Sequence, residues 1–141
     1  MPHPRTTIRQ KVALLLLEAE TAAGDRVYDS KTQAITTLPA LRVWTREDDF
    51  TEWRAMTGRG MERQLELVVE CIHSNATPAT AAANLDALAR EVEVVFDANI
   101  DIDDNALSAV YASTSIEFTD EVDPPLALAS LLYNVSYHDE I

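Results

Sequence analysis

The chain has 141 residues, of which 47% are apolar and 25% charged, and it carries a formal net charge of −13 at pH 7. This composition predicts one soluble globular domain over residues 1–141 and excludes a disordered or fibrous protein. The longest apolar run, residues 12–17, is far too short to cross a membrane.

The charges are unevenly distributed. Residues 1–64 contain ten Lys or Arg and nine Asp or Glu, whereas residues 65–141 contain one basic residue, Arg90, and fifteen acidic ones. Because Lys and Arg neutralise phosphates in nucleic-acid complexes, such an acidic domain should be a poor direct binder of DNA. Alternatively, the acidic side chains only keep the surface solvated. In both cases one region of the folded protein should repel polyanions.

The first predicted element is an amphipathic helix. Thr6 or Thr7 is the expected N-cap and Gly24 the expected C-terminal stop. Apolar residues at helical spacing form its inner stripe, namely Ile8, Val12, Leu15, Leu16 and Ala19. Leu14 and Leu17 fall outside that stripe, so they are candidates for contact with a partner, although single exposed leucines are also ordinary.

A short extended piece at residues 26–29 precedes a strand predicted over residues 40–45. Residues 46–60 then combine many charges with two glycines, which predicts a long loop. Phe50, Trp53 and Met56 lie in this loop. We expect the loop to be mobile in a free subunit and these three side chains to be buried against another chain.

Four further elements follow. Alternating apolar residues predict a strand over residues 61–74, and Thr77 followed by Pro78 predicts the start of a helix that ends near Phe96. Its inner face is expected to carry Ala81, Leu85, Leu88, Val92 and Val95. Strands are predicted over residues 110–118 and 126–137. The fold class is therefore α+β: an antiparallel-rich mixed sheet of four or five strands with two main helices packed on it, in the order α-β-β-β-α-β-β.

No catalytic or metal-binding constellation is evident. His3, His73 and His138 are far apart in sequence, and Cys71 falls on the inner face of a strand, where it resembles a small buried hydrophobic residue. Residues 97–105 place oxygen side chains at alternate positions, but Ile102 stands where a calcium loop needs glycine. We expect a solvated loop there, with weak cation binding as the alternative. The sequence predicts no enzyme, no cofactor and no metal site.

The order of several segments resembles the tail terminator, or tail completion, proteins of long-tailed bacteriophages, the group that includes minor tail protein U. After the opening helix, the segments that carry the resemblance are VYDS (27–30), LPALRVWT (38–45), RQLELVVEC (63–71), LDALAREVEVVFDAN (85–99), IEFTDE (116–121) and PLALASLLYNVSYH (125–138). They are patterns of core and strand residues and cover nearly the whole chain.

The resemblance implies a structural virion protein, assembled in the host cytoplasm and located in the neck region of the tail. Such a protein forms a ring, most commonly a hexamer, that caps the head-proximal end of the tail tube. The ring stops tube polymerisation and provides a docking surface for head–tail connector proteins, while DNA passes through without specific binding. The resemblance implies no catalytic residues and no membrane contact, and residues 46–60 would reach toward the tube protein or a neighbouring subunit.

Two alternatives remain open at this point. A head–tail connector or stopper ring would have much the same composition. A small acidic protein that binds or inhibits a host protein belongs to a different class. Mass in solution, with and without a tail tube protein, would separate the ring proteins from that second class.

Overall fold

The structure is a computed structural model that describes residues 2–32, 34–53, 60–119 and 125–140, and only the backbone of residues 50–53. The elements follow one another as α1 (Pro4–Glu18), β1 (Val27–Tyr28), β2 (Ala40–Trp53), β3 (Met61–Ser74), α2 (Pro78–Ala98), β4 (Ser108–Thr119) and β5 (Leu126–Asp139). Five strands form a single sheet in the spatial order β1-β2-β3-β5-β4. The β1–β2 pair is parallel and the other pairs are antiparallel. The predicted α+β fold and element order are confirmed.

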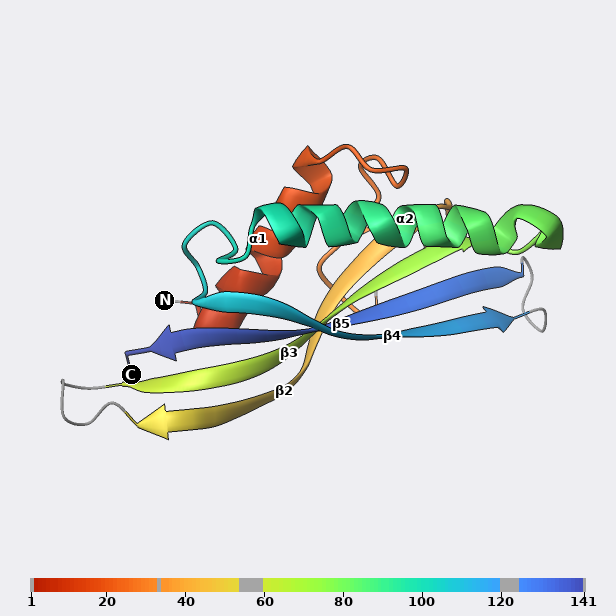
Figure 1. Ribbon diagram of the computed structural model, residues 1–141. Coiled ribbons are helices and arrows are strands. Elements are labelled where there is room, and N and C mark those ends of the chain that lie inside the picture. The colour runs from red at the N-terminus through yellow and green to blue at the C-terminus, as the bar shows by residue number, and fades with distance from the viewer. Residues whose placement is uncertain (1, 33, 54–59, 120–124, 141) are drawn as a thin grey trace.

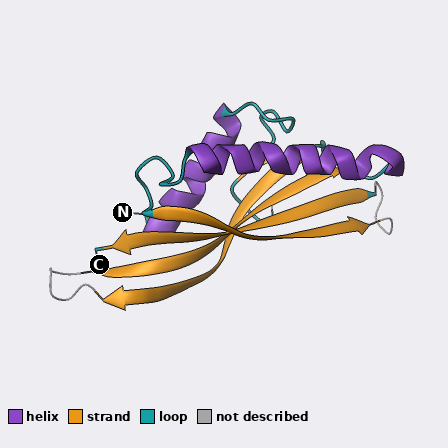
Figure 2. Cartoon of the chain, viewed as in Figure 1, coloured by secondary structure: helices purple, strands orange, loops and turns teal. Residues whose placement is uncertain are grey.

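The sheet is strongly twisted, and both helices lie on the same side of it (Figures 1 and 2). The odd-numbered residues of β3 from Leu65 to Cys71 and those of β5 point toward the helices and are almost completely buried. They form one apolar core with the inner residues of both helices, including Ile8, Val12 and Leu16 of α1 and Leu85, Leu88, Val92 and Phe96 of α2. Period-two burial on the strands and helical spacing on α1 and α2 explain why these sequences fold into these elements.

Helix α1 begins earlier and ends earlier than predicted. The Nδ1 atom of His3 accepts a hydrogen bond from the backbone N–H of Arg5 at 3.2 Å, so His3 is the N-cap in place of Thr6 or Thr7. Pro4 follows at the first helical position, where a missing N–H costs nothing. The helix ends at Glu18, and Glu20 has a φ of +53°. Ala19 is consequently exposed and does not belong to the inner stripe.

The predicted loop at residues 46–60 is wrong for residues 46–53, and residues 54–59 lie outside the described residues. Residues 46–53 continue β2, and Trp53 pairs with Met61 of β3. The ladder has irregularities between Thr45 and Asp48 and between Phe50 and Glu52. Such bulges interrupt the period-two pattern of a strand. The charged residues 46–53 were therefore not predicted to form one. Residues 46–53 therefore belong to one strand of a long hairpin arm, and the mobility expected of the segment in a free subunit stays a prediction.

Helix α2 begins at Pro78 as predicted and runs two residues further, to Ala98. Thr77 precedes it but makes no side-chain capping hydrogen bond, contrary to the prediction. Phe96 is buried on the inner face, while Val95 is only partly buried. Strand β3 has the predicted limits, and β4 and β5 extend slightly beyond theirs.

Candidate assembly interfaces

The outer face of α1 carries the two leucines that the helical pattern placed outside the core. Leu14 is 41% exposed and Leu17 is 40% exposed, whereas their neighbour Leu16 is completely buried. Leu15, between them in sequence, packs partly against the core. The structure thus places an apolar pair on the surface, and its contact with a partner stays a prediction.

The second predicted set belongs to the hairpin of β2 and β3, whose paired ends extend past α2 (Figure 1). Phe50 and Trp53 lie near the end of β2, opposite Arg63 and Met61 of β3. The side chains of Phe50 and Trp53, and all of Met56, lie outside the described residues. Their interface role stays a prediction, and the backbone of Phe50 and Trp53 lies on a paired strand in place of the predicted loop.

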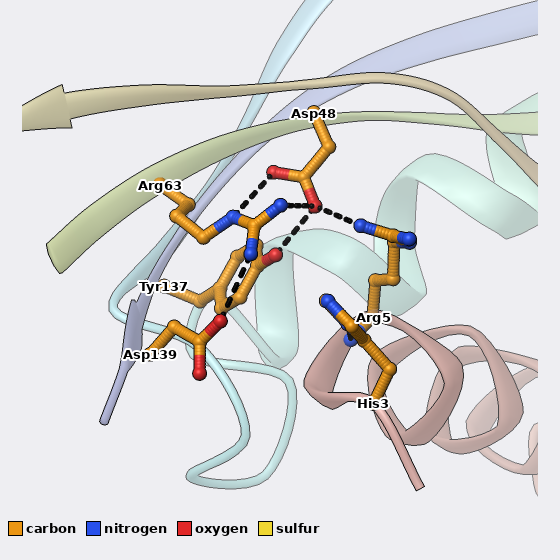
Figure 3. A network of polar contacts seen from close by, with 6 residues as sticks. All are labelled: His3, Arg5, Asp48, Arg63, Tyr137 and Asp139. Atoms are coloured by element: carbon orange, nitrogen blue, oxygen red, sulfur yellow. Dashed lines mark hydrogen bonds and ion pairs between the residues drawn. The ribbon is translucent and has the colours of Figure 1, made fainter. Parts of the chain in front are cut away.

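A network of polar side chains holds this arm against the rest of the molecule (Figure 3). The Asp48 carboxylate of β2 accepts hydrogen bonds from Nη1 of Arg5 at 2.9 Å and from the Tyr137 hydroxyl at 2.6 Å. Nη2 of Arg63 lies 3.0 Å from Oδ2 of Asp48, and its Nη1 lies 2.9 Å from Oδ2 of Asp139. The network therefore joins α1, β2, β3 and β5.

The charges of this network balance, with two guanidinium groups facing two carboxylates. The Asp48 side chain is only 8% exposed, and that of Arg63 only 16%. Burial alone would raise the pKa of Asp48, but the hydrogen bonds from Tyr137 and Arg5 and the charge of Arg63 outweigh it and hold this pKa below its ordinary value. The Arg63 guanidinium also lies 5.8 Å from the centre of the Tyr137 ring. These contacts fit a structural role for the cluster.

The outermost strand, β4, exposes large apolar side chains that the sequence pattern did not flag as surface residues. Tyr111 is 49%, Ile116 52% and Phe118 48% exposed, and all three lie on the side of the sheet that the helices cover elsewhere. Alternation along residues 110–118 predicted a strand but not its place in the sheet. Because β4 is the last strand in the order, one of its long sides has no strand partner among the described residues.

A hollow of about 510 Å³ lies between α2 and β4. Its floor is aromatic: the rings of Phe96 and Tyr133 stack with 3.8 Å between centroids, and Tyr111 meets Tyr133 edge-on at 5.7 Å. Glu93 and Asp97 of α2 also line it. The hollow therefore combines an apolar floor with negative charge.

A second hollow, of about 430 Å³, lies beside β2, near the edge of the sheet opposite β4. Its lining includes Arg9 of α1, Lys31 and Trp44, with Asp29 as the one acidic residue. The ammonium group of Lys31 lies 5.5 Å from the centre of the Trp44 indole ring. The Nε atom of Arg9 is buried and has no hydrogen-bond partner within the described part of the chain.

The surroundings of Cys71 and of the acidic segment 97–105 indicate structural roles for these residues. Cys71 is completely buried, and burial raises the pKa of its thiol to about 12. Asp103, in the acidic segment 97–105, pairs with Lys11 at 2.8 Å. No group of three or more His, Cys, Asp and Glu side chains in the described ranges is arranged to hold a metal ion. None of the helices that the structure describes is both long and apolar enough to span a bilayer.

Comparisons with known proteins address the fold. No protein-family model matches the chain, and no curated protein matches its sequence. Among solved structures, a chain in the virion of a native gene transfer agent particle is similar to it, with a TM-score of 0.52 and 17% sequence identity. The match covers 94% of this chain and 92% of that chain. Because the sequence identity is low, the match shows a shared fold alone, and this fold extends over nearly the whole length of both chains.

Proposed function

We propose that this protein is a structural subunit of a phage-like virion. The observation that carries the proposal is the shared fold with a chain of the gene transfer agent virion, which extends over 94% of this chain and 92% of the other. Because both chains are matched almost end to end, the similarity is not that of a small common motif. We infer a location in the particle and association with other structural proteins of it.

Within the particle we assign the chain the role of a tail terminator. In this role it forms a ring, most simply a hexamer, on the head-proximal end of the tail tube, stops tube growth and offers a surface to the head connector. A ring subunit needs two unlike faces that meet head to tail. Helix α1, which carries the exposed leucines, packs against β1 and β2, whereas β4 with its exposed apolar side chains lies at the other edge of the sheet. The two apolar surfaces are therefore unlike. The acidic half of the chain is suited to line a bore through which DNA slides.

We further infer that the protein is not an enzyme. The most extensively bonded titratable side chains, Asp48 and Arg63, contact each other, Tyr137 and Asp139. Bonds that satisfy charges within the fold favour stability over reactivity.

The test is deletion of the gene in a host that produces the particle, followed by electron microscopy of the lysate. Loss of a terminator should leave tails of uncontrolled length that lack heads. Tails of normal length beside unattached filled heads would instead assign the connector role. Normal particles would contradict a virion role altogether, as would a purified protein that stays monomeric and does not bind the tube protein.

A further inference from the structure

Strand β4 and the adjacent side of α2 form a surface that we call the acidic edge, defined by Glu93, Asp97, Tyr111, Ile116, Glu117 and Phe118. Residues 113–119 of β4 pair regularly with β5 on one side, and no described strand lies on the other. Natural proteins usually protect such a strand with Lys, Pro or a covering element. This run contains neither Lys nor Pro, and Glu117 is its one charged residue. Its two large apolar side chains, Ile116 and Phe118, are about half exposed.

The opposite side of the sheet has the complementary chemistry. We call it the basic edge, defined by Arg9, Lys31, Trp44 and Arg46. Strand β1 pairs with β2 only at Leu41 and Arg42, so beyond them β2 has no described strand on its outer side. The Arg46 side chain is 54% exposed, and its Nη1 atom lies 4.0 Å from Oε2 of Glu66. The acidic residues of β2 are Glu47, directly after Arg46, and Asp48, Asp49 and Glu52, which lie further toward the end of the hairpin.

We propose that the acidic edge of one copy of this chain binds the basic edge of the next copy. This inference deepens the ring proposed above and rests on it. The hollow between α2 and β4 offers aromatic rings and two carboxylates. The basic edge offers an indole ring and cationic side chains, which can pair with them. Pairing unlike edges generates a head-to-tail arrangement, which closes into a ring when the rotation between subunits permits it.

Charge decides between this arrangement and a symmetric one. Two β4 strands meeting each other would bring the Glu93, Asp97 and Glu117 carboxylates of both copies to one interface. Like charges opposed across an interface are strongly unfavourable, whereas unlike charges favour association and fix its orientation. The single basic residue of the C-terminal half, Arg90, pairs with Glu93 at 3.0 Å and so offsets one of the three carboxylates of the acidic edge.

Cross-linking of the purified protein tests the orientation. Ser115→Cys places a thiol on the acidic edge and Thr32→Cys places one beside the basic edge; both positions are exposed and uncharged. Buried Cys71 should stay unreactive, with the unsubstituted protein as the check. We expect a short bis-maleimide to join Ser115→Cys to Thr32→Cys protein in a mixture, to join neither variant to itself, and to give a ladder of trimers and larger species with the doubly substituted chain. Ala82→Cys, on the exposed side of α2, should give no ladder with Thr32→Cys.

Three results of the cross-linking experiment would overturn the inference. They are a covalent dimer of Ser115→Cys protein alone, a dimer of Thr32→Cys protein alone, and oligomers by mass that give no cross-link between the two edges. A protein that remains monomeric yet ends tube growth would also overturn the inference while leaving the terminator role intact. Conversely, a head-to-tail ladder together with normal tails in the deletion strain would remove the proposed function and leave the interface standing.

A charge reversal supplies an independent measurement. Glu117→Arg should weaken self-association by about tenfold or more, because it sets a cation against Lys31 and Arg46 of the neighbouring copy. Asp86→Arg, on the exposed face of α2, makes the same change in net charge and should not weaken association. Equal effects of the two substitutions, at unchanged melting temperature, would show that only net charge matters and would overturn the assigned contact.

Discussion

At Gly60 the backbone passes unusually close to β5. Its φ is +120°, and a Cβ atom added there would lie 2.6 Å from the carbonyl oxygen of Asp139 and 3.0 Å from the ring of His138. Neither the backbone conformation nor the backbone oxygen leaves room for a side chain. A residue without a side chain at position 60 therefore helps the Met61 end of β3 to pair with β5.

We expect Gly60→Ala to lower the free energy of unfolding by about 3 kcal/mol or more, since strain and a clash with the backbone add together. Gly24→Ala is the matched control, because Gly24 also has a positive φ, of +60°, but a Cβ atom there would meet only an arginine side chain at 3.8 Å. Its cost should be about 1 kcal/mol. Urea unfolding of both variants measures the difference, and equal costs would contradict the close approach.

Asp48 links the stability of the arm to pH. Since its pKa in the folded protein is lowered, its contribution is fully present above the ordinary value of 3.8 and is lost as pH falls through the lower folded value. Asp48→Asn keeps the shape but removes the charge that faces Arg5 and Arg63, and we expect it to cost about 2 kcal/mol at neutral pH. The difference from the unsubstituted protein should shrink below pH 3.8.

Asp49→Asn is the control for this measurement, because Asp49 is exposed and adjacent in sequence. Unfolding free energies of both variants across the acid range decide the matter. A constant difference between Asp48→Asn and the unsubstituted protein at all pH values would show that shape, and not charge, explains the effect.

At the scale of single elements, the outer face of α1 can be separated from its core face. Changing Leu14 and Leu17 together to Glu should leave the melting temperature within a few degrees, because both are about 40% exposed and Glu is a good helix former. Assembly or tube capping should fail. Leu16→Glu, one residue away and completely buried, should instead unfold the subunit. Unfolding of the double variant would show that these leucines belong to the core.

The elements differ in how well the sequence predicted them, for reasons visible at particular residues. In β3, the apolar residues at odd positions from Leu65 to Cys71 match a strand buried on the helix side, and the limits of the strand were predicted correctly. In β2, two bulges displace the pattern after Thr45, and the charges of Asp48 are satisfied by Arg5, Arg63 and Tyr137, which are distant in sequence. Local rules cannot anticipate such partners.

The same reasoning applies to the candidate interfaces. Leu14 and Leu17 could be placed on the surface because helical periodicity sets their direction relative to Ile8 and Val12. The exposure of Ile116 and Phe118 could not be predicted, because it depends on β4 being the outermost strand. Strand order depends on how the whole sheet assembles, and apolar and polar residues alternate in central and outer strands alike.

At the scale of the whole molecule, the net charge of −13 opposes every association between copies. Raising the ionic strength from about 0.01 M to 0.15 M shortens the Debye length from ~30 Å to ~8 Å, which screens this long-range repulsion. Contacts within a closed interface are screened much less. We therefore expect moderate salt to promote self-association, as measured by sedimentation. Steady weakening of association over that range would mean that exposed ion pairs dominate the contact.

Strand β5 follows β4 in sequence but lies between β3 and β4 in the sheet. Every residue of β3 is paired with β5, from Met61 with Asp139 to Ser74 with Leu126. During synthesis on the ribosome, the helices and the first four strands therefore emerge before the strand that joins them into one layer. Until β5 is released, β3 and β4 each present an unpaired side, and such sides are prone to aggregation in incomplete chains. Folding of this subunit should be a late and concerted event, so that a copy becomes competent to assemble only after the whole sheet has been translated.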